Sequence, residues 1–139
     1  MQHYIYNFQD FLKIKESTAY SIEDITSVQI STYRGDNEES FTLEQLKEVF
    51  STCLCITDIT VYDLEELHIP DEIECLKKLE DLSFHVKSKF SISRKIGNLS
   101  LKSLLVHTED ENFQLPSSIE KIETIQSINI KTPHFSFPN

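Results

Sequence analysis

Tyr62, His85, His107 and Lys131 form a series of side chains that could do chemistry. They follow one another at intervals of 23, 22 and 24 residues (85 − 62, 107 − 85 and 131 − 107). Tyrosine is a favoured anchor at protein interfaces, and imidazole changes its charge near neutral pH. Two histidines could ligate a metal, but no cysteine or carboxylate is placed to complete a tetrahedral site. We therefore expect no metal here; the simpler interpretation is a solvated polar face.

Acidic clusters recur along the chain at a similar interval, and a basic segment that contains Lys87 and Lys89 interrupts them. If the clusters lie in aligned loops, they make a negative rim with one basic notch, which would attract a basic partner. The alternative is that they are ordinary solvated loops. The candidate rim residues are Asp36, Glu38, Glu39, Asp63, Glu65, Glu66, Glu109, Asp110 and Glu111.

Sequence motifs of the common catalytic sites are absent. There is no Gly-x-Ser-x-Gly elbow, no glycine-rich phosphate loop and no His-Glu-x-x-His helix. Cys53-Leu54-Cys55 is not a redox Cys-x-x-Cys motif. The many carboxylates occur in polar segments, where nothing would tune their pKa for acid–base catalysis. We expect neither an enzyme nor a cofactor.

Composition narrows the class of partner. The 139 residues suit one soluble domain, and 23 acidic against 13 basic side chains give a formal charge of −10. This charge disfavours nucleic acid, which needs clustered lysine and arginine. No apolar run is long enough to span a membrane, and the N-terminus does not resemble a signal peptide. We expect a cytoplasmic protein with no membrane partner, in which Cys53 is a reduced core residue.

A repeat of 23 residues organises the chain. Apolar residues stand at offsets 0, 4, 7, 10, 13 and 15 from Ile69 and again from Leu115. The intervening unit from Ile92 lacks one residue, and the three starts are 23 apart (92 − 69 and 115 − 92). Leu67, Phe90 and Phe113 precede the starts by two residues. A fixed apolar pattern with this long a period is typical of stacked repeats.

The pattern Leu-x-x-Leu-x-x-Leu-x-Leu after an Ile/Leu-Pro start resembles the leucine-rich repeat family, in its variety of about 23 residues. The resemblance implies an α/β solenoid, a horseshoe fragment whose concave face is a parallel β-sheet of about five strands. Its convex returns would be helical or irregular. The alternative is a helix followed by a strand, repeated by chance. The asparagine ladder of the family is missing, so the bends should be less regular.

The repeat divides one domain, residues 1–139, into units. Residues 1–21 would be an aromatic-rich N-terminal cap that seals the core, and 22–45 an atypical first repeat. Repeats follow at 46–68, 69–91, 92–114 and 115–137. Thr42 is a plausible N-cap of a helix from Leu43 to Phe50, with Leu43, Leu46, Val49 and Phe50 buried. Strands are predicted at Val28–Ile30, Ile59–Val61, Leu82–Phe84, Leu104–Val106 and Ile128–Ile130.

Alternation along these strands predicts which side chains face outward on the concave sheet, in three transverse rows. The first row is Ser27, Asp58, Asp81, Ser103 and Ser127, and the second is Gln29, Thr60, Ser83, Leu105 and Asn129. The third is Ser31, Tyr62, His85, His107 and Lys131. The candidate contacts are Asp58, Thr60, Tyr62, Asp81, Ser83, His85, Leu105, His107, Asn129 and Lys131.

These observations favour a non-enzymatic module that binds another protein, one with a basic surface, through its concave face and acidic rim. An immunity or inhibitor protein that neutralises a toxin or enzyme is one alternative, based on size and charge alone. Another begins from the end of the chain, where Phe135-Ser136-Phe137-Pro138 repeats the start of a unit. That ending suggests a fragment of a longer repeat protein, or self-association through the C-terminal edge strand.

Overall fold

The protein, described from a computed structural model over residues 3–31 and 41–133, is an α/β fold with one six-stranded parallel sheet. The strands follow sequence order: β1 (His3–Ile5), β2 (Ile25–Ser31), β3 (Asp58–Ile69), β4 (Asp81–Ile92), β5 (Ser103–Thr108) and β6 (Ser127–Lys131). The helical segments are α1 (Phe8–Glu16), η1 (Ile22–Asp24), α2 (Leu43–Thr52), η2 (Asp71–Cys75), η3 (Arg94–Asn98) and η4 (Ser117–Lys121), of which the η segments are short 3₁₀ helices.

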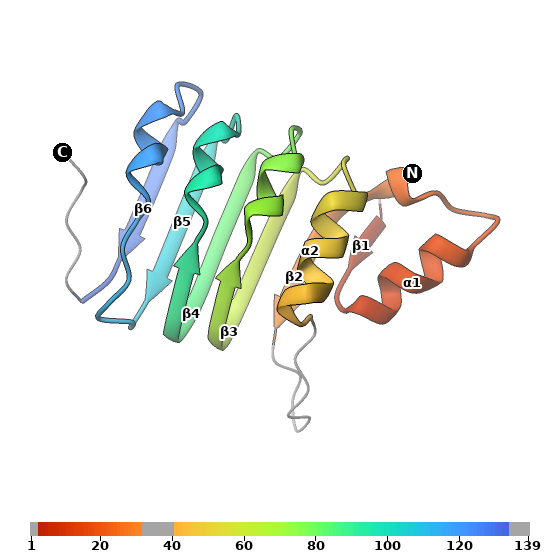
Figure 1. Ribbon diagram of the computed structural model, residues 1–139, viewed down its shortest axis with the longest axis horizontal. Helices are drawn as coiled ribbons and strands as arrows, with labels where there is room; N and C mark the ends of the chain where they lie inside the picture. The colour runs from red at the N-terminus through yellow and green to blue at the C-terminus, as the bar shows by residue number, and fades with distance from the viewer. Residues whose placement is uncertain (1–2, 32–40, 134–139) are drawn as a thin grey trace.

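One face of the sheet is covered and the other is bare. The segments α2, η2, η3 and η4 stand side by side on one face (Figure 1). Strand residues alternate accordingly, with Ile59 and Val61 buried while Thr60 between them is partly exposed. On the opposite face no described residue belongs to a helix. Each of the five predicted strands lies within one of the strands β2 to β6, and the sheet is parallel, so both predictions are confirmed.

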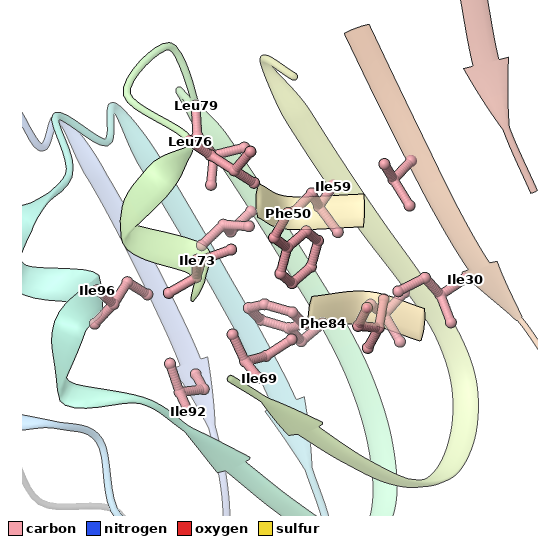
Figure 2. Close-up of a cluster of buried hydrophobic side chains, with 14 of the residues drawn as sticks. Ile30, Phe50, Ile59, Ile69, Ile73, Leu76, Leu79, Phe84, Ile92 and Ile96 are labelled. Atoms are coloured by element: carbon pink, nitrogen blue, oxygen red, sulfur yellow. The ribbon is translucent and has the colours of Figure 1, made fainter. Parts of the chain in front are cut away.

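The core fills the space between the sheet and the helical segments. Phe50 from α2 and Phe84 from β4 extend into one apolar cluster, joined by Ile73 and Leu76 from the η2 return (Figure 2). These are the inward positions that the repeat predicts, and they are fully buried because no unit can bury its own apolar stripe alone. Cys53 is buried in the same cluster as a free thiol, as predicted.

An aromatic spine runs along the end of the core. The ring centroids of Phe84 and Phe90 are 5.0 Å apart, and those of Phe90 and Phe113 are also 5.0 Å apart in a stacked arrangement. Leu67 is the backbone partner of Phe90 and extends the row to the preceding unit. The predicted row of large apolar side chains is therefore buried and continuous.

Strands β3 and β4 are longer than the repeat predicts. Each spans 12 residues and continues through the bend, where Leu67 pairs with Phe90 and Ile69 with Ile92. Their register shifts between Val61 and Leu64, so the alternation of apolar residues is broken there. In a β-bulge of this kind, two residues of one strand stand opposite one residue of its neighbour. The alternation typical of a strand is lost there, which explains why the sequence resembles that of a loop.

The N-terminal part corrects two further predictions. The predicted cap contains a sixth strand, β1, which pairs with β2, so the prediction of about five strands was too low. In β1, Ile5 is buried and Tyr4 is exposed, and Tyr6 directly after the strand is exposed as well. The helix prediction is confirmed, because Thr42 caps α2 in a capping box with Gln45. Leu43, in contrast, is 41% exposed rather than buried, since it lies on the solvent side of the first turn.

Candidate functional site

The bare face of the sheet carries the predicted rows in register. Ser27 pairs with Asp58, Asp58 with Asp81, Asp81 with Ser103, and Ser103 with Ser127. The second row is equally continuous, from Gln29 through Thr60, Ser83 and Leu105 to Asn129. Parallel pairing therefore places side chains from different units about 4.8 Å apart along each row.

The first row contains two neighbouring carboxylates, and a serine holds each of them from the outer side. Ser27 Oγ donates to Asp58 Oδ1 over 2.7 Å, and Ser103 Oγ donates to Asp81 Oδ1 over 2.6 Å. Like charges on directly opposed positions destabilise a sheet. An amine or guanidinium placed over Asp58 and Asp81 would relieve that repulsion, so the pair is suited to bind a cationic side chain.

The third row is interrupted at Tyr62. Tyr62 pairs with Ser31, but the register shift that follows Val61 removes the predicted pairing with His85. Asp63 has a φ of 48°, in the left-handed region, and makes the local bend. The predicted row is therefore irregular at this point, because Tyr62 and Asp63 both stand opposite His85. The side chain of Tyr62 is 46% exposed on the bare face.

The remainder of the third row forms a histidine cluster. His85 pairs with His107, and His107 with Lys131. The two imidazole rings meet edge to face, with centroids 4.8 Å apart and an interplanar angle of 84°. His85 Nδ1 and His107 Nε2 are shielded from solvent and have no hydrogen-bond partner. These nitrogens are unusual because buried polar atoms are nearly always paired.

Two cavities hollow the bare face. The histidine cavity, of about 300 Å³, is lined by Asp63, His85, Val86, Lys87, His107, Thr108, Glu109 and Lys131. The central cavity, of about 310 Å³, is lined by Ile59, Thr60, Asp81, Leu82, Ser83, Ser103, Leu104, Leu105, Ser127 and Asn129. Eight of the ten predicted concave contacts line one cavity or the other. A ninth, Asp58, is the backbone partner of Asp81, which lines the central cavity.

The predicted acidic rim differs from the structure. Asp36, Glu38 and Glu39 lie outside the described residues. Glu65 and Glu66 belong to strand β3 rather than to a loop. Ser88 Oγ donates to Glu65 Oε2 over 2.7 Å, and Lys87 Nζ lies 3.9 Å from Glu65 Oε1. The basic segment of β4, which is the predicted basic notch, thus lies beside the acidic segment of β3 and partly neutralises it.

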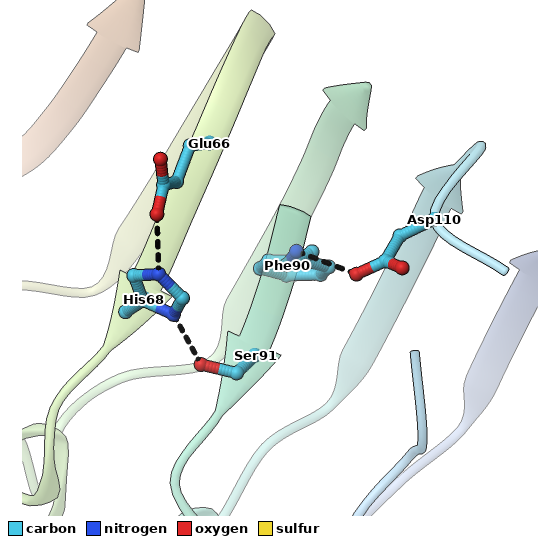
Figure 3. Close-up of polar contacts among 5 residues, drawn as sticks. All are labelled: Glu66, His68, Phe90, Ser91 and Asp110. Carbon is cyan, nitrogen blue, oxygen red and sulfur yellow. Dashed lines mark hydrogen bonds and ion pairs between the residues drawn. The ribbon is translucent and has the colours of Figure 1, made fainter. Parts of the chain in front are cut away.

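Asp110 uses both of its carboxylate oxygens within the protein. The backbone N–H of Phe90 donates to Oδ2 over 2.9 Å (Figure 3). The backbone N–H of Asn112 donates to Oδ1, also over 2.9 Å. These two hydrogen bonds lower the pKa of the Asp110 carboxyl below its usual value, with that from Phe90 the larger cause. Asp110 therefore joins β4 to the turn after β5, while Glu109 and Glu111 are exposed.

We predict that Asp110→Asn lowers the free energy of unfolding by about 1 kcal/mol at pH 7, because one amide oxygen cannot replace two carboxylate acceptors. Since the folded-state pKa is lowered, the contribution of Asp110 is complete above the ordinary carboxyl pKa and is lost as the pH falls through the folded value. Urea unfolding should therefore show a difference that shrinks below about pH 4. Glu111→Gln is the control, and an equal loss in both variants would contradict this role.

Sequence reasoning missed a chain of polar contacts across β3 and β4. Ser91 Oγ lies 2.7 Å from His68 Nδ1, and His68 Nε2 lies 2.9 Å from Glu66 Oε1 (Figure 3). The hydrogen bond from His68 lowers the pKa of Glu66. His68 and Ser91 are 23 residues apart (91 − 68), so the repeat period was the signal that could have paired them.

These contacts connect a serine, a histidine and a carboxylate in the order of a catalytic triad, but their surroundings are not those of a catalytic site. The side chains of His68 and Glu66 are 46% and 52% exposed, so water competes with every contact. None of the three residues lines either cavity described above. A triad needs an oxyanion site and a substrate pocket beside its nucleophile. We interpret these contacts as a polar link between strands β3 and β4.

The described residues offer little support for a reactive cysteine or a metal-binding site. Burial raises the pKa of the Cys53 thiol to about 12, which keeps it protonated and unreactive. Within residues 3–31 and 41–133 no three His, Cys, Asp or Glu side chains are grouped to hold a metal ion. No helix in those residues has the length and apolar character needed to cross a membrane.

No family model, curated protein or solved structure matches the chain. Function must therefore be inferred from the geometry of the chain itself. The feature with the most distinctive geometry is the bare face of the sheet, with its paired carboxylates, exposed tyrosine and two cavities.

Proposed function

We propose that the chain is a solenoid of the leucine-rich repeat type, which acts as a non-enzymatic protein-binding module. The repeated strand and return units support this proposal, and so does a ladder of backbone hydrogen bonds at equivalent positions. The N–H groups of residues 57, 80, 102 and 126 donate to the carbonyls of residues 26, 57, 80 and 102, each over 2.8 Å. Units that contact only their neighbours in this way are the defining property of a solenoid.

The observation that carries the binding proposal is the bare face of the sheet. A parallel sheet is ordinarily covered on both faces, and its strands are then apolar on both sides. Here the face opposite the helices carries polar and charged side chains around Leu105, and both cavities open on it. Repeat proteins use such an extended, side-chain-rich face to bind other proteins.

The chemistry of the first row indicates a basic group on the partner. Asp58 and Asp81 lie side by side, and each accepts a hydrogen bond from a serine on the strand beyond it. A lysine or arginine from another protein would bind to both carboxylates at once. Tyr62, which lies further along β3 than Asp58, adds an exposed aromatic ring. Aromatic anchors beside charged pairs are typical of energetic centres of interfaces.

Affinity capture with a matched pair of variants tests this proposal. The bait would be the wild-type chain, Asp58→Asn/Asp81→Asn, or Glu120→Gln/Glu123→Gln, each added at low salt to lysate of the source cells. Asparagine keeps an oxygen that accepts from Ser27 and Ser103 while removing the two charges. The control removes the same charge from the η4 return, on the helical side of the sheet.

We predict that one partner binds the wild-type and control baits and that its affinity for Asp58→Asn/Asp81→Asn falls at least about tenfold, or about 1.4 kcal/mol. Stepwise salt should release it, because exposed ion pairs are screened. If the two double variants capture the partner equally well, the bare face is not the binding surface and the proposal fails.

Self-association through β6 is a second candidate, favoured by the packing at that end of the sheet. Ile128 and Ile130 are only half-buried, whereas the equivalent Leu104 and Val106 of β5 are fully buried. The outer edge of β6 pairs with no other described strand. An open strand edge can accept another chain. Recovery of the bait alone in the capture experiment would favour this candidate over a foreign partner.

A further inference from the structure

We propose that the histidine cavity is a subsite for a carboxylate group, which His85, His107 and Lys131 bind through their nitrogen atoms. The inference deepens the proposed function, because the carboxylate would belong to the protein that occupies the bare face. It identifies the second chemical group which that partner must present, in addition to the basic group over Asp58 and Asp81.

Three nitrogen-bearing side chains meet along one row at the cavity. His85, His107 and Lys131 occupy directly opposed positions on β4, β5 and β6. Because His85 Nδ1 and His107 Nε2 are shielded from solvent, a group in the cavity would meet the opposite nitrogen of each ring. An oxyanion matches them, because it accepts from both an imidazole N–H and an ammonium group.

The arrangement of charges around the cavity favours an anion over a cation. The imidazoles are half-buried in the wall, while the charged lining residues Asp63, Lys87, Glu109 and Lys131 are all exposed. The carboxylates of the lining therefore remain in contact with water, and the groups at depth are donors. A metal ion would need a third ligand, which no grouping of the described residues supplies.

The size and apolar wall of the cavity indicate a carboxylate on a carbon stem. Its volume of about 300 Å³ is at the lower end for small-molecule sites, and it exceeds what a water or a lone ion would need. Val86 and Thr108, both buried, form part of the wall. The accessible lining is mostly apolar, which suits the methylene groups of an acidic side chain or the backbone of a chain terminus better than a phosphate group.

With this subsite, the bare face would bind a positively charged group at one place and a negatively charged group at another. Asp81 and His85 are four residues apart on β4, which corresponds to roughly 13 Å along a strand. The partner would thus place a basic group over the paired carboxylates and a carboxylate in the histidine cavity, roughly 13 Å away. Opposite charges at a fixed separation select both the partner and its orientation.

The binding of a carboxylate here should depend on pH. A protonated imidazole donates from both nitrogens and carries a positive charge, so protonation strengthens anion binding. The other charged groups that line the cavity are Asp63 from β3, Lys87 from β4, Glu109 after β5 and Lys131 from β6. Of these side-chain types, imidazole is the one whose charge changes near neutral pH.

Titration of the isotope-labelled chain with small ions, followed by NMR, tests the subsite without any partner. The probes are glutarate as carboxylate, inorganic phosphate as the alternative oxyanion, and ethylammonium as cation, all at constant ionic strength. The readout is the imidazole C–H resonances of His85 and His107, with those of His68 as the internal reference. Lys131→Met removes one proposed donor, and Lys95→Met removes an equivalent charge from the η3 return.

We expect glutarate to shift the signals of His85 and His107 with saturation and to leave His68 unaffected. The affinity should fall at least about fivefold in Lys131→Met and remain unchanged in Lys95→Met, and it should rise as the pH is lowered. Equal shifts of all three histidines, no saturation, or preferential binding of ethylammonium would overturn the proposal. Saturation by phosphate but not by glutarate would overturn the assignment to a carboxylate.

The outcomes separate this inference from the proposed function. If glutarate fails to bind while Asp58→Asn/Asp81→Asn still abolishes capture, the carboxylate subsite is wrong and the binding face remains. If glutarate binds as expected but the capture experiment fails, the cavity is an anion site that does not depend on the proposed partner.

Discussion

Replacing Phe84 by alanine should lower the free energy of unfolding by about 3–5 kcal/mol, the range observed for large-to-small substitutions in well-packed cores. Phe84 is fully buried in β4, between β3 and β5, and its ring packs 5.0 Å from that of Phe90. Truncation removes apolar contacts with both the sheet and the returns, and the surrounding strands cannot collapse into the space because their backbone pairing fixes them.

Such a loss is a large fraction of the total stability of a domain of this size, about 5–15 kcal/mol. Urea unfolding followed by circular dichroism measures it. Ser83→Ala, one residue earlier and on the bare face, is the control and should change stability by less than about 0.5 kcal/mol. A loss below about 1 kcal/mol for Phe84→Ala would mean that the spine does not hold neighbouring units together.

Gly97→Ala should be destabilising by about 2 kcal/mol, although alanine ordinarily favours a helix by about 1 kcal/mol over glycine. A Cβ at Gly97 in η3 would lie 2.6 Å from both the Cβ and the backbone oxygen of Ser118 in η4. A flexible side chain could move away, but a backbone carbonyl cannot move without displacing the neighbouring return. The missing side chain therefore lets two consecutive returns pack closely.

The variant Ser118→Gly separates this mechanism from a general effect on η3. It removes the Cβ and Oγ that a new methyl group would meet, so Gly97→Ala/Ser118→Gly should lose less stability than the sum of the single variants. The same urea titration applies, and Lys95→Ala on an exposed position of η3 is the matched control. Additive losses would show that the side chain of Ser118 is not the cause and would assign the clash to its backbone oxygen, which the variant keeps.

The repeat pattern was sufficient to predict the sheet and its register. Inward residues such as Ile59, Leu82 and Leu104 recur at fixed offsets, and a parallel stack places equal offsets side by side. All six pairs that the first and second rows form between β3 and β6 follow from this rule. The register is determined because a shift by one residue would turn every buried side chain to the other face.

The bend after the strands could not be predicted from the same pattern. Asp63 adopts a left-handed φ there, and the resulting bulge sets two residues, Tyr62 and Asp63, opposite His85. Aspartate is among the few residues that adopt this conformation readily, but its identity alone does not locate a bulge. The short strand β1 was missed for another reason, because three residues are too few to display a period.

The candidate site was predicted in position but not in detail. The outward rows followed from alternation, whereas the partners of individual side chains depend on geometry. The serine contacts of Asp58 and Asp81, the engagement of Asp110 by backbone N–H groups, and the unpaired nitrogens of His85 and His107 all require coordinates. The acidic rim was predicted to lie in loops, whereas β3 and β4 continue through it and bring Lys87 close to Glu65.

Carboxyl footprinting of the captured complex tests the central proposal most directly, namely that the bare face of the sheet is the binding surface. Side-chain carboxylates are labelled in the free chain and in the complex, and the labelled residues are identified by mass spectrometry. We predict that the partner protects Asp58 and Asp81 and leaves Glu120 and Glu123 on the helical side fully reactive. Protection of Glu120 and Glu123, with Asp58 and Asp81 unchanged, would place the partner on the opposite side and contradict the proposal.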